Sequence, residues 1–387
     1  MDAVKILRIV FEGLPLYGEK SFEFNFSAMD RVNDPHQVFP ILRHVYTQKI
    51  IAIAGINASG KTTALKLLHF AMNVVLENQS LNSSEMLGKS FLGDHTRMTV
   101  YFYYQDSCFM LCSDIGKNAE DRLFYKEEWL RKKSREDVKT RKSLFDFSQS
   151  DVIQQRSQLN AETLSVLHDD DSIVIKATRG NKTALVQAIV LTNMNLCMTL
   201  GHTPVKILQA FDPNLEELTA QEENGERSYT IKFRNQENRF QVHTPSALSE
   251  FISSGTIKGQ NLMAMICVVL QSGGYLMVDE LENHLNKALV QMILDIFNQP
   301  KMNPHGACLV FTTHYTEILD MIDRKDNIYI TRRERKDPKA LEVLNYSDEV
   351  RRNDVKKSEV FLSNYIPGTA PSYENIRALE NQLCRES

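Results

Sequence analysis

One loop in this sequence has the residue types that bind phosphate. Residues 55–62 read Gly-Ile-Asn-Ala-Ser-Gly-Lys-Thr and fit the pattern G-x-x-x-x-G-K-[ST], with an apolar strand before them and helical spacing after them. Gly55 and Gly60 let the backbone curl so that successive N–H groups face an anion, and a helix N-terminus adds partial positive charge. We expect Lys61 to reach the β- and γ-phosphates and the Thr62 hydroxyl to ligate Mg²⁺. The other loop residues predicted to contact the nucleotide are Asn57, Ala58, Ser59 and Thr63.

Two carboxylates follow a second apolar run. Asp279 and Glu280 come directly after residues 275–278, Tyr-Leu-Met-Val. A buried strand that ends in two acids is costly unless the acids have a role, and ligands of open α/β sheets bind at the carboxyl edge. We expect Asp279 to hold the Mg²⁺ shell and Glu280 to position or deprotonate an attacking water. The pair is weak evidence alone and gains weight from the phosphate loop.

Two further signals lie near this pair in the sequence. Residues 253–256, Ser-Ser-Gly-Thr, precede a predicted helix over 258–271, so Ser254 and Gly255 are either an anion site or an ordinary helix cap. His314 ends the apolar run 309–313 and follows Asp279 after one predicted helix, 285–297. We therefore expect His314 at the same sheet edge as Asp279 and Glu280.

The elements around these residues predict an α/β fold. Residues 4–26 read as two strands around a turn, 49–54 as a short strand, and 61–76 as a helix. Residues 98–104 and 107–113 pair as a hairpin, and from 249 to about 331 helix and strand alternate. These segments are predicted to form an N-terminal lobe over 1–115 and a C-terminal lobe over 205–337, with a second hairpin over 229–233 and 240–243.

The middle of the chain differs in character. Over 116–168 charge rises and helical spacing dominates, and Arg131–Lys142 holds seven Lys or Arg against two acids. We expect a charged helical lobe over 116–204, with further helix over 172–200, inserted between the two motif-bearing lobes. Residues 338–387 are predicted to be a tail, in which Ser358–Pro371 either packs on the sheet or docks a partner. No internal repeat and no heptad array is present, so long coiled-coil arms are not expected.

The order of phosphate loop, Ser-Ser-Gly-Thr, Asp-Glu and Thr-Thr-His resembles the ABC-type ATPase heads of the SMC/RecF/OLD group. It is most similar to stand-alone OLD-like AAA ATPases of prokaryotic anti-phage and abortive-infection systems. The opening strands, Phe211-Asp212-Pro213 and the tail residues Asn353-Asp354 and Lys357-Ser358 also resemble that group. The resemblance covers about 1–75 and 205–331, without specific motifs in between.

This resemblance implies a P-loop ATPase head with a mixed-sheet lobe that acts as a head-to-tail dimer or a larger even-numbered assembly. ATP and Mg²⁺ would lie between the phosphate loop of one subunit and Ser254-Gly255 of the other. Glu280 would be the catalytic base, His314 would contact the γ-phosphate, and Lys61 would stabilise the transferred charge. Two departures are evident: His284-Leu285-Asn286-Lys287 stands where many relatives have His-Leu-His-Pro, and Gln105, at a hairpin tip, is a poor candidate for the Mg²⁺-sensing glutamine.

Three functions remain open at this point. The first is a cytoplasmic ATPase whose nucleotide-driven dimerisation controls a separate effector, by analogy a nuclease or toxin. The second is a RecF-like repair ATPase that binds DNA through Arg131–Lys142 and the cluster Arg332, Arg333, Arg335 and Lys336. The third, a scaffold that binds ATP without hydrolysis, is disfavoured because Lys61, Asp279 and Glu280 are all present.

Composition excludes several other classes. The 387 residues carry a net charge of −4 and 42% hydrophobic residues, so a strongly basic nucleic-acid binder and a disordered chain are excluded. The six cysteines form no Cys-x-x-Cys pair, which argues against a zinc knuckle and for reduced thiols. The longest apolar run, 262–270, is about half of what a bilayer requires, and the N-terminus lacks signal-peptide features. We expect a cytoplasmic protein without a membrane partner.

Overall fold

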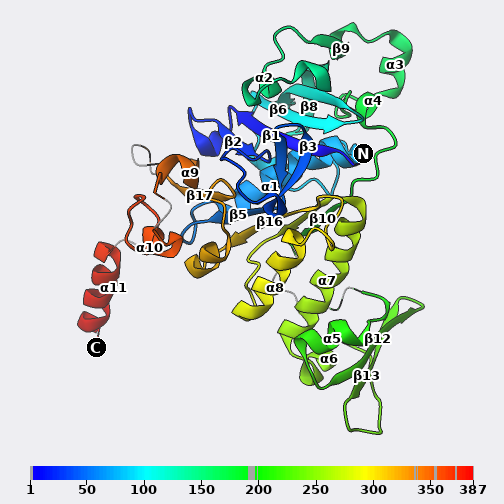
Figure 1. Ribbon diagram of the computed structural model, residues 1–387, viewed down its shortest axis with the longest axis vertical. Coiled ribbons are helices and arrows are strands. Elements are labelled where there is room, and N and C mark those ends of the chain that lie inside the picture. Colours follow the sequence, from blue (N-terminus) through cyan, green and yellow to red (C-terminus); the bar gives the residue numbers. More distant parts are fainter. Residues whose placement is uncertain are drawn as a thin grey trace.

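A computed structural model describes residues 3–190, 197, 199–334, 337, 339–352, 355–370 and 373–386. The chain forms a mixed α/β fold in which a mostly parallel sheet lies beneath an antiparallel sheet, with a smaller lobe at one end (Figure 1). Several residues used in the sequence predictions lie outside the described residues, namely 191–196, 198, Arg335, Lys336, Asn353 and Asp354. No helix among the described residues is long and apolar enough to cross a membrane.

The parallel sheet contains the three strands that lead into the phosphate loop, the Asp279-Glu280 pair and His314. Its order is β10 (Leu185–Ala188), β15 (Tyr275–Val278), β16 (Cys308–Thr313), β5 (Ile50–Ala54), β17 (Ile328–Arg333) and β18 (Leu341–Asn345). The first five strands run parallel, and only β18 is antiparallel to its neighbour. The carboxyl ends of β5, β15 and β16 therefore meet at one edge, as the sequence predicted for the three motifs.

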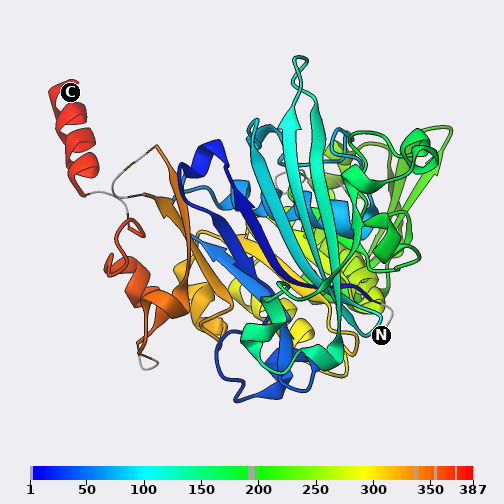
Figure 2. The ribbon, with the colours of Figure 1, turned by 90° about the horizontal axis from the view of Figure 1, so that it is seen from above.

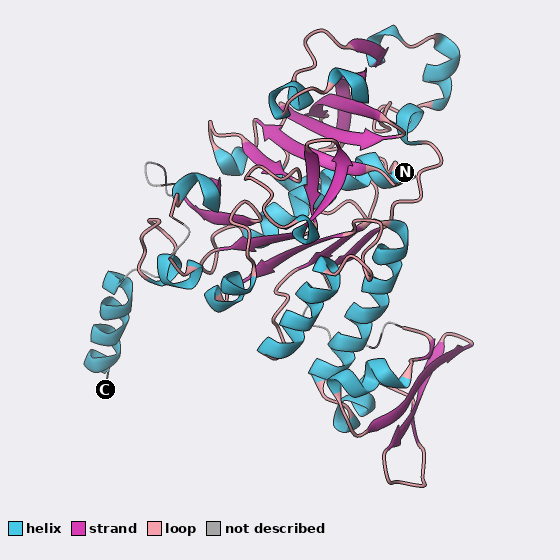
Figure 3. Ribbon diagram, in the orientation of Figure 1, coloured by secondary structure: helices cyan, strands magenta, loops and turns pink. Residues whose placement is uncertain are grey.

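Both faces of this sheet are covered, which explains why its strands read as continuous apolar runs. Ile51 and Ile53 of β5 face helix α1 (Lys61–Met72) and the antiparallel sheet, and α1 continues as one π-helical turn to Glu77. Their neighbours Ile50 and Ala52 point to the opposite face, against α7 (Ser254–Ser272) and α8 (Lys287–Asn298). Figure 3 shows these helices below the sheet and the strand-rich layer above it.

The antiparallel sheet covers α1 from the other side. Its order is β2 (Phe22–Asn25), β1 (Lys5–Glu12), β6 (Thr96–Tyr104), β7 (Ser107–Lys117), β8 (Leu123–Ser134) and β9 (Asp151–Gln155). The two predicted hairpins are confirmed, because β1 pairs with β2 and β6 pairs with β7 around a turn in which Gln105 and Asp106 both have positive φ. A short hairpin of β3 (Val38–Leu42) and β4 (Val45–Gln48) packs beside it.

The prediction of a helical lobe over 116–168 is wrong. Strand β7 crosses the predicted boundary at residue 115, and β8 and β9 continue the same sheet (Figure 2). α-Helix is limited to α2 (Arg141–Phe145) and α3 (Ala161–Val166), beside two short 3-10 turns at Arg135–Asp137 and Arg156–Gln158. The described part of 172–200 holds α4 (Ile175–Thr178) and β10. The physical reason is that β8 turns Glu128 and Lys133 inward, so its apolar alternation is broken in the sequence.

Partners distant in the sequence stabilise these inward charges. Arg156 Nη1 lies 3.0 Å from Glu128 Oε2, and the Ser113 and Ser172 hydroxyls also donate to this carboxylate. Lys133 Nζ donates to the Ser143 and Asp146 carbonyls. The charged stretch is therefore partly interior, and it is not one solvated helical face.

The smaller lobe has its own core and lies beside the N-terminal part of α7, away from the two larger sheets (Figure 1). It consists of β11 (Gly201–His202), β12 (Leu215–Glu223), β13 (Glu226–Phe233) and β14 (Phe240–Val242) with α5 (Val205–Phe211) and α6 (Pro245–Phe251). The predicted second hairpin is confirmed, because Tyr229 pairs with Val242. After β18 the tail forms α9 (Tyr346–Glu349), α10 (Lys357–Leu362) and α11 (Tyr373–Glu386), and the first two pack against the parallel sheet.

Candidate active site

The phosphate loop lies between β5 and α1, as predicted. Gly55 is required by close approach, because a Cβ there would lie 2.4 Å from the Thr331 carbonyl oxygen of β17. Gly60 has a φ of +97°, a conformation that L-residues rarely adopt, and Ala58 is also left-handed at φ +59°. These two turns curl the backbone over the start of α1, which is the shape that a phosphate cradle needs.

Lys61 folds back over this loop. Its Nζ donates to the carbonyls of Gly55 and Ile56, at 2.9 Å each. Burial lowers the pKa of Lys61 to about 8, while the carboxylates of Asp279, Glu280 and Glu282 act in the opposite direction. The ammonium is therefore held where it can exchange these carbonyls for phosphate oxygens.

Asp279 joins the phosphate loop to the sheet edge. The Thr62 hydroxyl of α1 donates to Asp279 Oδ2 at 2.9 Å, and the Thr312 hydroxyl of β16 donates to Oδ1 at 2.6 Å. A hydroxyl and a carboxylate in contact fit Mg²⁺, which prefers oxygen ligands and usually completes its shell with water and substrate phosphates. No group of three or more His, Cys, Asp or Glu that could hold a metal ion was found within the described part of the chain. The residues present therefore suit a cation that is shared with a phosphate ligand.

Glu280 and His314 form a second pair beside Asp279. His314 Nε2 lies 2.9 Å from Glu280 Oε1, and both side chains keep about a third of their exposure. Glu280 has a φ of +50°, which is unusual for a non-glycine residue, and its N–H donates to the Thr312 hydroxyl at 2.7 Å. A carboxylate held in this way, with an imidazole beside it, can accept a proton from a water molecule.

Most of these residues border one cavity of about 580 Å³, whereas Gly55 and Asp279 are not part of its lining. The lining also includes three residues that were not predicted for this site, Leu16, Leu341 and Arg333, the last of which was expected in a DNA-binding cluster. Its lining consists of Leu16, residues 57–63, Glu280, His314, Arg333 and Leu341. Gln105 is not in this lining. Phosphate-loop amides, an ammonium, a carboxylate and an imidazole therefore converge on a space large enough for a nucleotide.

Ser254 and Gly255 lie elsewhere. They begin α7, where Ser253 caps the helix by accepting from the Thr256 N–H, and neither of them lines the cavity. The Ser254 hydroxyl is 3.2 Å from His284 Nδ1, and a Cβ on Gly255 would lie 2.5 Å from the His284 carbonyl oxygen. The first turn of α7 therefore packs on the loop that follows Asp279 and Glu280, apart from the phosphate loop of its own chain.

Three positioning residues were not predicted from the sequence. Thr312 bridges Asp279 and the Glu280 backbone, as described above. Buried Glu282 accepts from the His314 N–H at 2.7 Å, and Lys258 of α7 donates to the Glu280 carbonyl at 2.9 Å. Burial lowers the pKa of Lys258 to about 8, against the opposing effect of the nearby carboxylates. Only Thr312 and Glu282 had a signal, because they stand inside the Thr-Thr-His and Asp-Glu-Leu-Glu runs.

Comparisons with known proteins add little to this geometry. No protein-family model matches the chain, and no curated protein matches it. Among solved structures, a match is described as "Structure of the recombination mediator protein RecF-ATP in RecFOR pathway". That match has 10% sequence identity and a TM-score of 0.36, over 89% of this chain and 98% of that chain. At this identity and TM-score, the similarity carries no function over to the present protein.

Proposed function

We propose that this protein is a Mg²⁺-dependent ATPase that hydrolyses ATP to ADP and phosphate. The observation that carries the proposal is the contact of Asp279 with Thr62, which lines a cavity together with Lys61 and the Glu280–His314 pair. Oxygen ligands for a cation, an ammonium for phosphate and a base for water are the parts that phosphoryl transfer to water requires.

In this proposal each residue has a distinct task. The phosphate-loop amides and Lys61 bind the β- and γ-phosphates, and Thr62 and Asp279 hold Mg²⁺, which neutralises charge that develops on the phosphate oxygens. Glu280 orients the attacking water and accepts its proton, and His314 orients the Glu280 carboxylate and faces the γ-phosphate. Thr312, Glu282 and Lys258 fix the backbone of these two residues, because each bonds to a main-chain atom of Glu280 or His314.

We extend the proposal to an ABC-type head-to-tail dimer. Its support is that the helix start at Ser254 and Gly255 is partly exposed and lies outside the cavity of its own chain. A second subunit that supplies this helix start would close the open side of the nucleotide site with N–H groups and partial positive charge. Control of a separate effector and a role in anti-phage defence rest on the sequence resemblance alone and stay predictions.

The RecF-like alternative has less support from the basic residues that suggested it. Within 131–142, Arg131 and Lys133 donate to carbonyls of their own lobe and Arg135 pairs with Asp106. Of the second cluster, Arg332 pairs with Glu342, whereas Arg335 and Lys336 lie outside the described residues. Much of this charge therefore has internal partners, so we place direct DNA binding second.

The test is turnover and mass of the Glu280→Gln variant, with Glu317→Gln, an exposed acid outside the cavity, as the matched control. We expect phosphate release to fall at least 100-fold in Glu280→Gln only, since a general base contributes about 10² to 10⁴. Light scattering with ATP and Mg²⁺ should show a doubled mass for Glu280→Gln and no doubling for Lys61→Ala. Absence of phosphate release by the unmodified protein would refute the ATPase assignment, and unchanged turnover in Glu280→Gln would refute the role of Glu280 as the base. Unchanged mass would refute the dimer, and co-migration of short duplex DNA would favour the RecF-like alternative.

A further inference from the structure

A second cavity lies at the opposite edge of the parallel sheet. Its volume is about 460 Å³, and three segments far apart in the sequence enclose it. They are the loop 30–37 before β3, the turn 323–325 before β17, and the tail, which contributes Tyr346, Arg351, Arg352, Val355 and Lys357. Because β17 starts at Ile328 and β5 ends at the phosphate loop, this cavity lies at the amino edge of the parallel strands, away from the candidate ATPase site.

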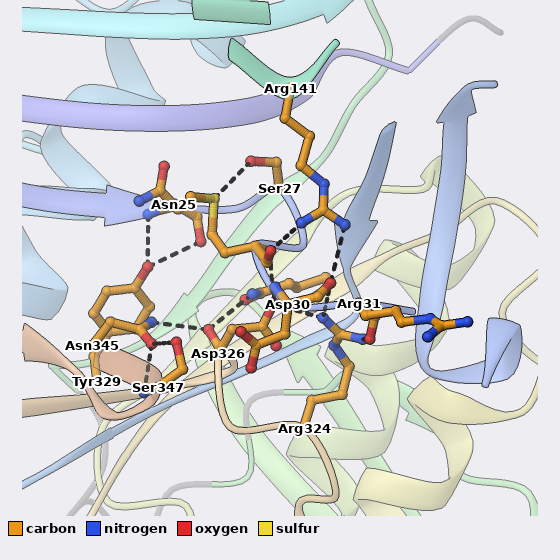
Figure 4. A network of polar contacts seen from close by, with 12 residues as sticks. Asn25, Ser27, Asp30, Arg31, Arg141, Arg324, Asp326, Tyr329, Asn345 and Ser347 are labelled. Carbon is orange, nitrogen blue, oxygen red and sulfur yellow. Dashed lines mark hydrogen bonds and ion pairs between the residues drawn. The ribbon is translucent and has the colours of Figure 1, made fainter. Parts of the chain in front are cut away.

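A buried ion pair involves Arg324, one of the residues that line this amino-edge cavity (Figure 4). Arg324 Nη2 lies 2.6 Å from Asp326 Oδ2, and both side chains are almost fully buried. The same oxygen accepts from the N–H groups of Met29 and Asp30, at 2.7 and 2.8 Å. Arg324 also donates to the carbonyls of Asp30 and Arg31. The turn before β17 and the start of the 30–37 loop are thereby locked together.

Two further cations brace the walls. Arg141 of α2 donates to the carbonyls of Met29 and Asp30 from outside the cavity (Figure 4). Lys325 Nζ donates to the Val350 and Arg351 carbonyls, at 2.8 and 3.0 Å, and so ties the tail to the sheet edge. In the described part of the chain, the 30–37 loop and the start of the tail segment are therefore held in place by these bonds, so a ligand would not have to order them.

The charge of this cavity is opposite to that of the whole chain, which is −4. Among the described residues, six cations line it against three carboxylates, and two of these acids already accept hydrogen bonds: Asp34 from the His36 N–H and Asp323 from Gln37. The six are Arg31, Arg324, Lys325, Arg351, Arg352 and Lys357.

Two guanidinium groups in this lining are available to a ligand. The exposed guanidinium groups of Arg31 and Arg351 have no hydrogen-bond partner among the described residues, and they come from different segments of the chain. An anion with several oxygens is the ligand that satisfies such charged, forked donors.

We propose that the amino-edge cavity binds a small molecule that carries two or more phosphate groups. Guanidinium groups on two walls match separate phosphates, and a single charge would leave the remaining cations repelling one another. The volume lies within the range of small-molecule sites. The aromatic residue in the lining, Tyr346, is 1% exposed, so base stacking does not contribute.

The test is calorimetric titration of the Lys61→Ala protein with inorganic tripolyphosphate and, separately, with ADP. Removing Lys61 weakens competing binding at the phosphate loop. The test variant adds Arg31→Ser with Arg351→Ser, and the matched control adds Arg179→Ser with Arg234→Ser, two exposed arginines outside this lining. We expect at least tenfold weaker tripolyphosphate binding in the test variant and less than twofold change in the control. If only ADP binds, the ligand is a nucleoside polyphosphate. If both ADP and tripolyphosphate bind, the cavity accepts oligophosphates in general.

Three outcomes would overturn the proposal. The first is no binding of either probe, and the second is equal binding by the test and control variants. The third is that a 20-nucleotide single strand binds through Arg31 and Arg351 while neither small probe does, which would make this edge a nucleic-acid surface. Because both arginines are exposed, the test variant should unfold at the control's temperature, and Arg31→Lys with Arg351→Lys, which keeps the charge, should recover part of the affinity.

Discussion

The Thr312 hydroxyl holds the two carboxylate positions of the candidate active site together. It donates to Asp279 Oδ1 at 2.6 Å and accepts from the Glu280 N–H at 2.7 Å, and the side chain is fully buried. Thr312→Val keeps the shape and removes both bonds. The bond to the carboxylate contributes roughly 1.5–3 kcal/mol, and the unpaired Glu280 N–H costs roughly 1–3 kcal/mol. We therefore expect the free energy of unfolding to fall by about 3 kcal/mol.

The same substitution should separate binding from catalysis. Glu280 keeps its left-handed backbone partly because Thr312 binds its N–H, so we expect the carboxylate to shift and kcat to fall about 100-fold. The KM for ATP should change little, because the phosphate loop and Lys61 are untouched. Urea unfolding and steady-state phosphate release measure the two effects. Thr312→Ser keeps the hydroxyl and should restore most of both.

A Thr312→Val protein with wild-type kcat would refute this account, because Glu280 would then not depend on the bridge. Loss of stability with unchanged kcat would leave Thr312 a purely structural residue. Equal losses in the Ser and Val variants would show that packing of the methyl group, and not the hydroxyl, is what matters.

Three further predictions concern other parts of the molecule. Because burial lowers the pKa of Lys61 to about 8, its ammonium loses its proton in the free protein above that pH. The Kd for ATP, measured by calorimetry between pH 7 and 9.5, should therefore rise by up to about tenfold per pH unit above pH 8. Lys61→Arg stays charged over this range and should make the Kd nearly independent of pH. Gly55→Ala puts a Cβ 2.4 Å from the Thr331 carbonyl oxygen, so we expect ATP binding to be lost and unfolding to cost about 1–3 kcal/mol less; normal ATP titration would contradict the close approach. Glu128→Ala leaves the buried Arg156 guanidinium without its carboxylate partner at 3.0 Å, so the free energy of unfolding measured in urea should fall by about 3–5 kcal/mol. A loss below about 1 kcal/mol would mean that the carbonyl acceptors of Arg156 are enough to stabilise its buried charge.

The features that local sequence could predict are those whose physics is local. A strand, a glycine-bounded turn and a helix start are neighbours in the sequence, so the geometry of residues 50–72 follows from their order. Asp279 and His314 were predictable for a related reason, because parallel strands that end in polar residues bring those ends to one edge. The roles of these residues in catalysis stay predictions until they are measured.

The errors arose where contacts between distant segments decide the structure. Strand β8 reads as a charged helix because Glu128 and Lys133 occupy inward positions, and the groups that pair with them lie 10 to 45 positions away. Lys258 gave no signal either, since its contact with the Glu280 carbonyl depends on how α7 packs against the loop after β15. A sequence shows which residues carry charge but not which distant groups neutralise it.

The position of β5 in the middle of the parallel sheet has a consequence for synthesis on the ribosome. β5 is near the N-terminus, and both of its neighbours in the sheet, β16 and β17, are translated long after it. The Ser59 hydroxyl of the phosphate loop forms its hydrogen bond with the Thr331 hydroxyl, which is 272 positions later in the chain. Until then the apolar strand and the phosphate loop have no sheet to join, so the emerging chain exposes them in a state prone to misfolding or aggregation. We expect a ribosome-bound chain that stops before Ile328 to bind no nucleotide, and chaperone demand to peak during translation of the middle of the chain.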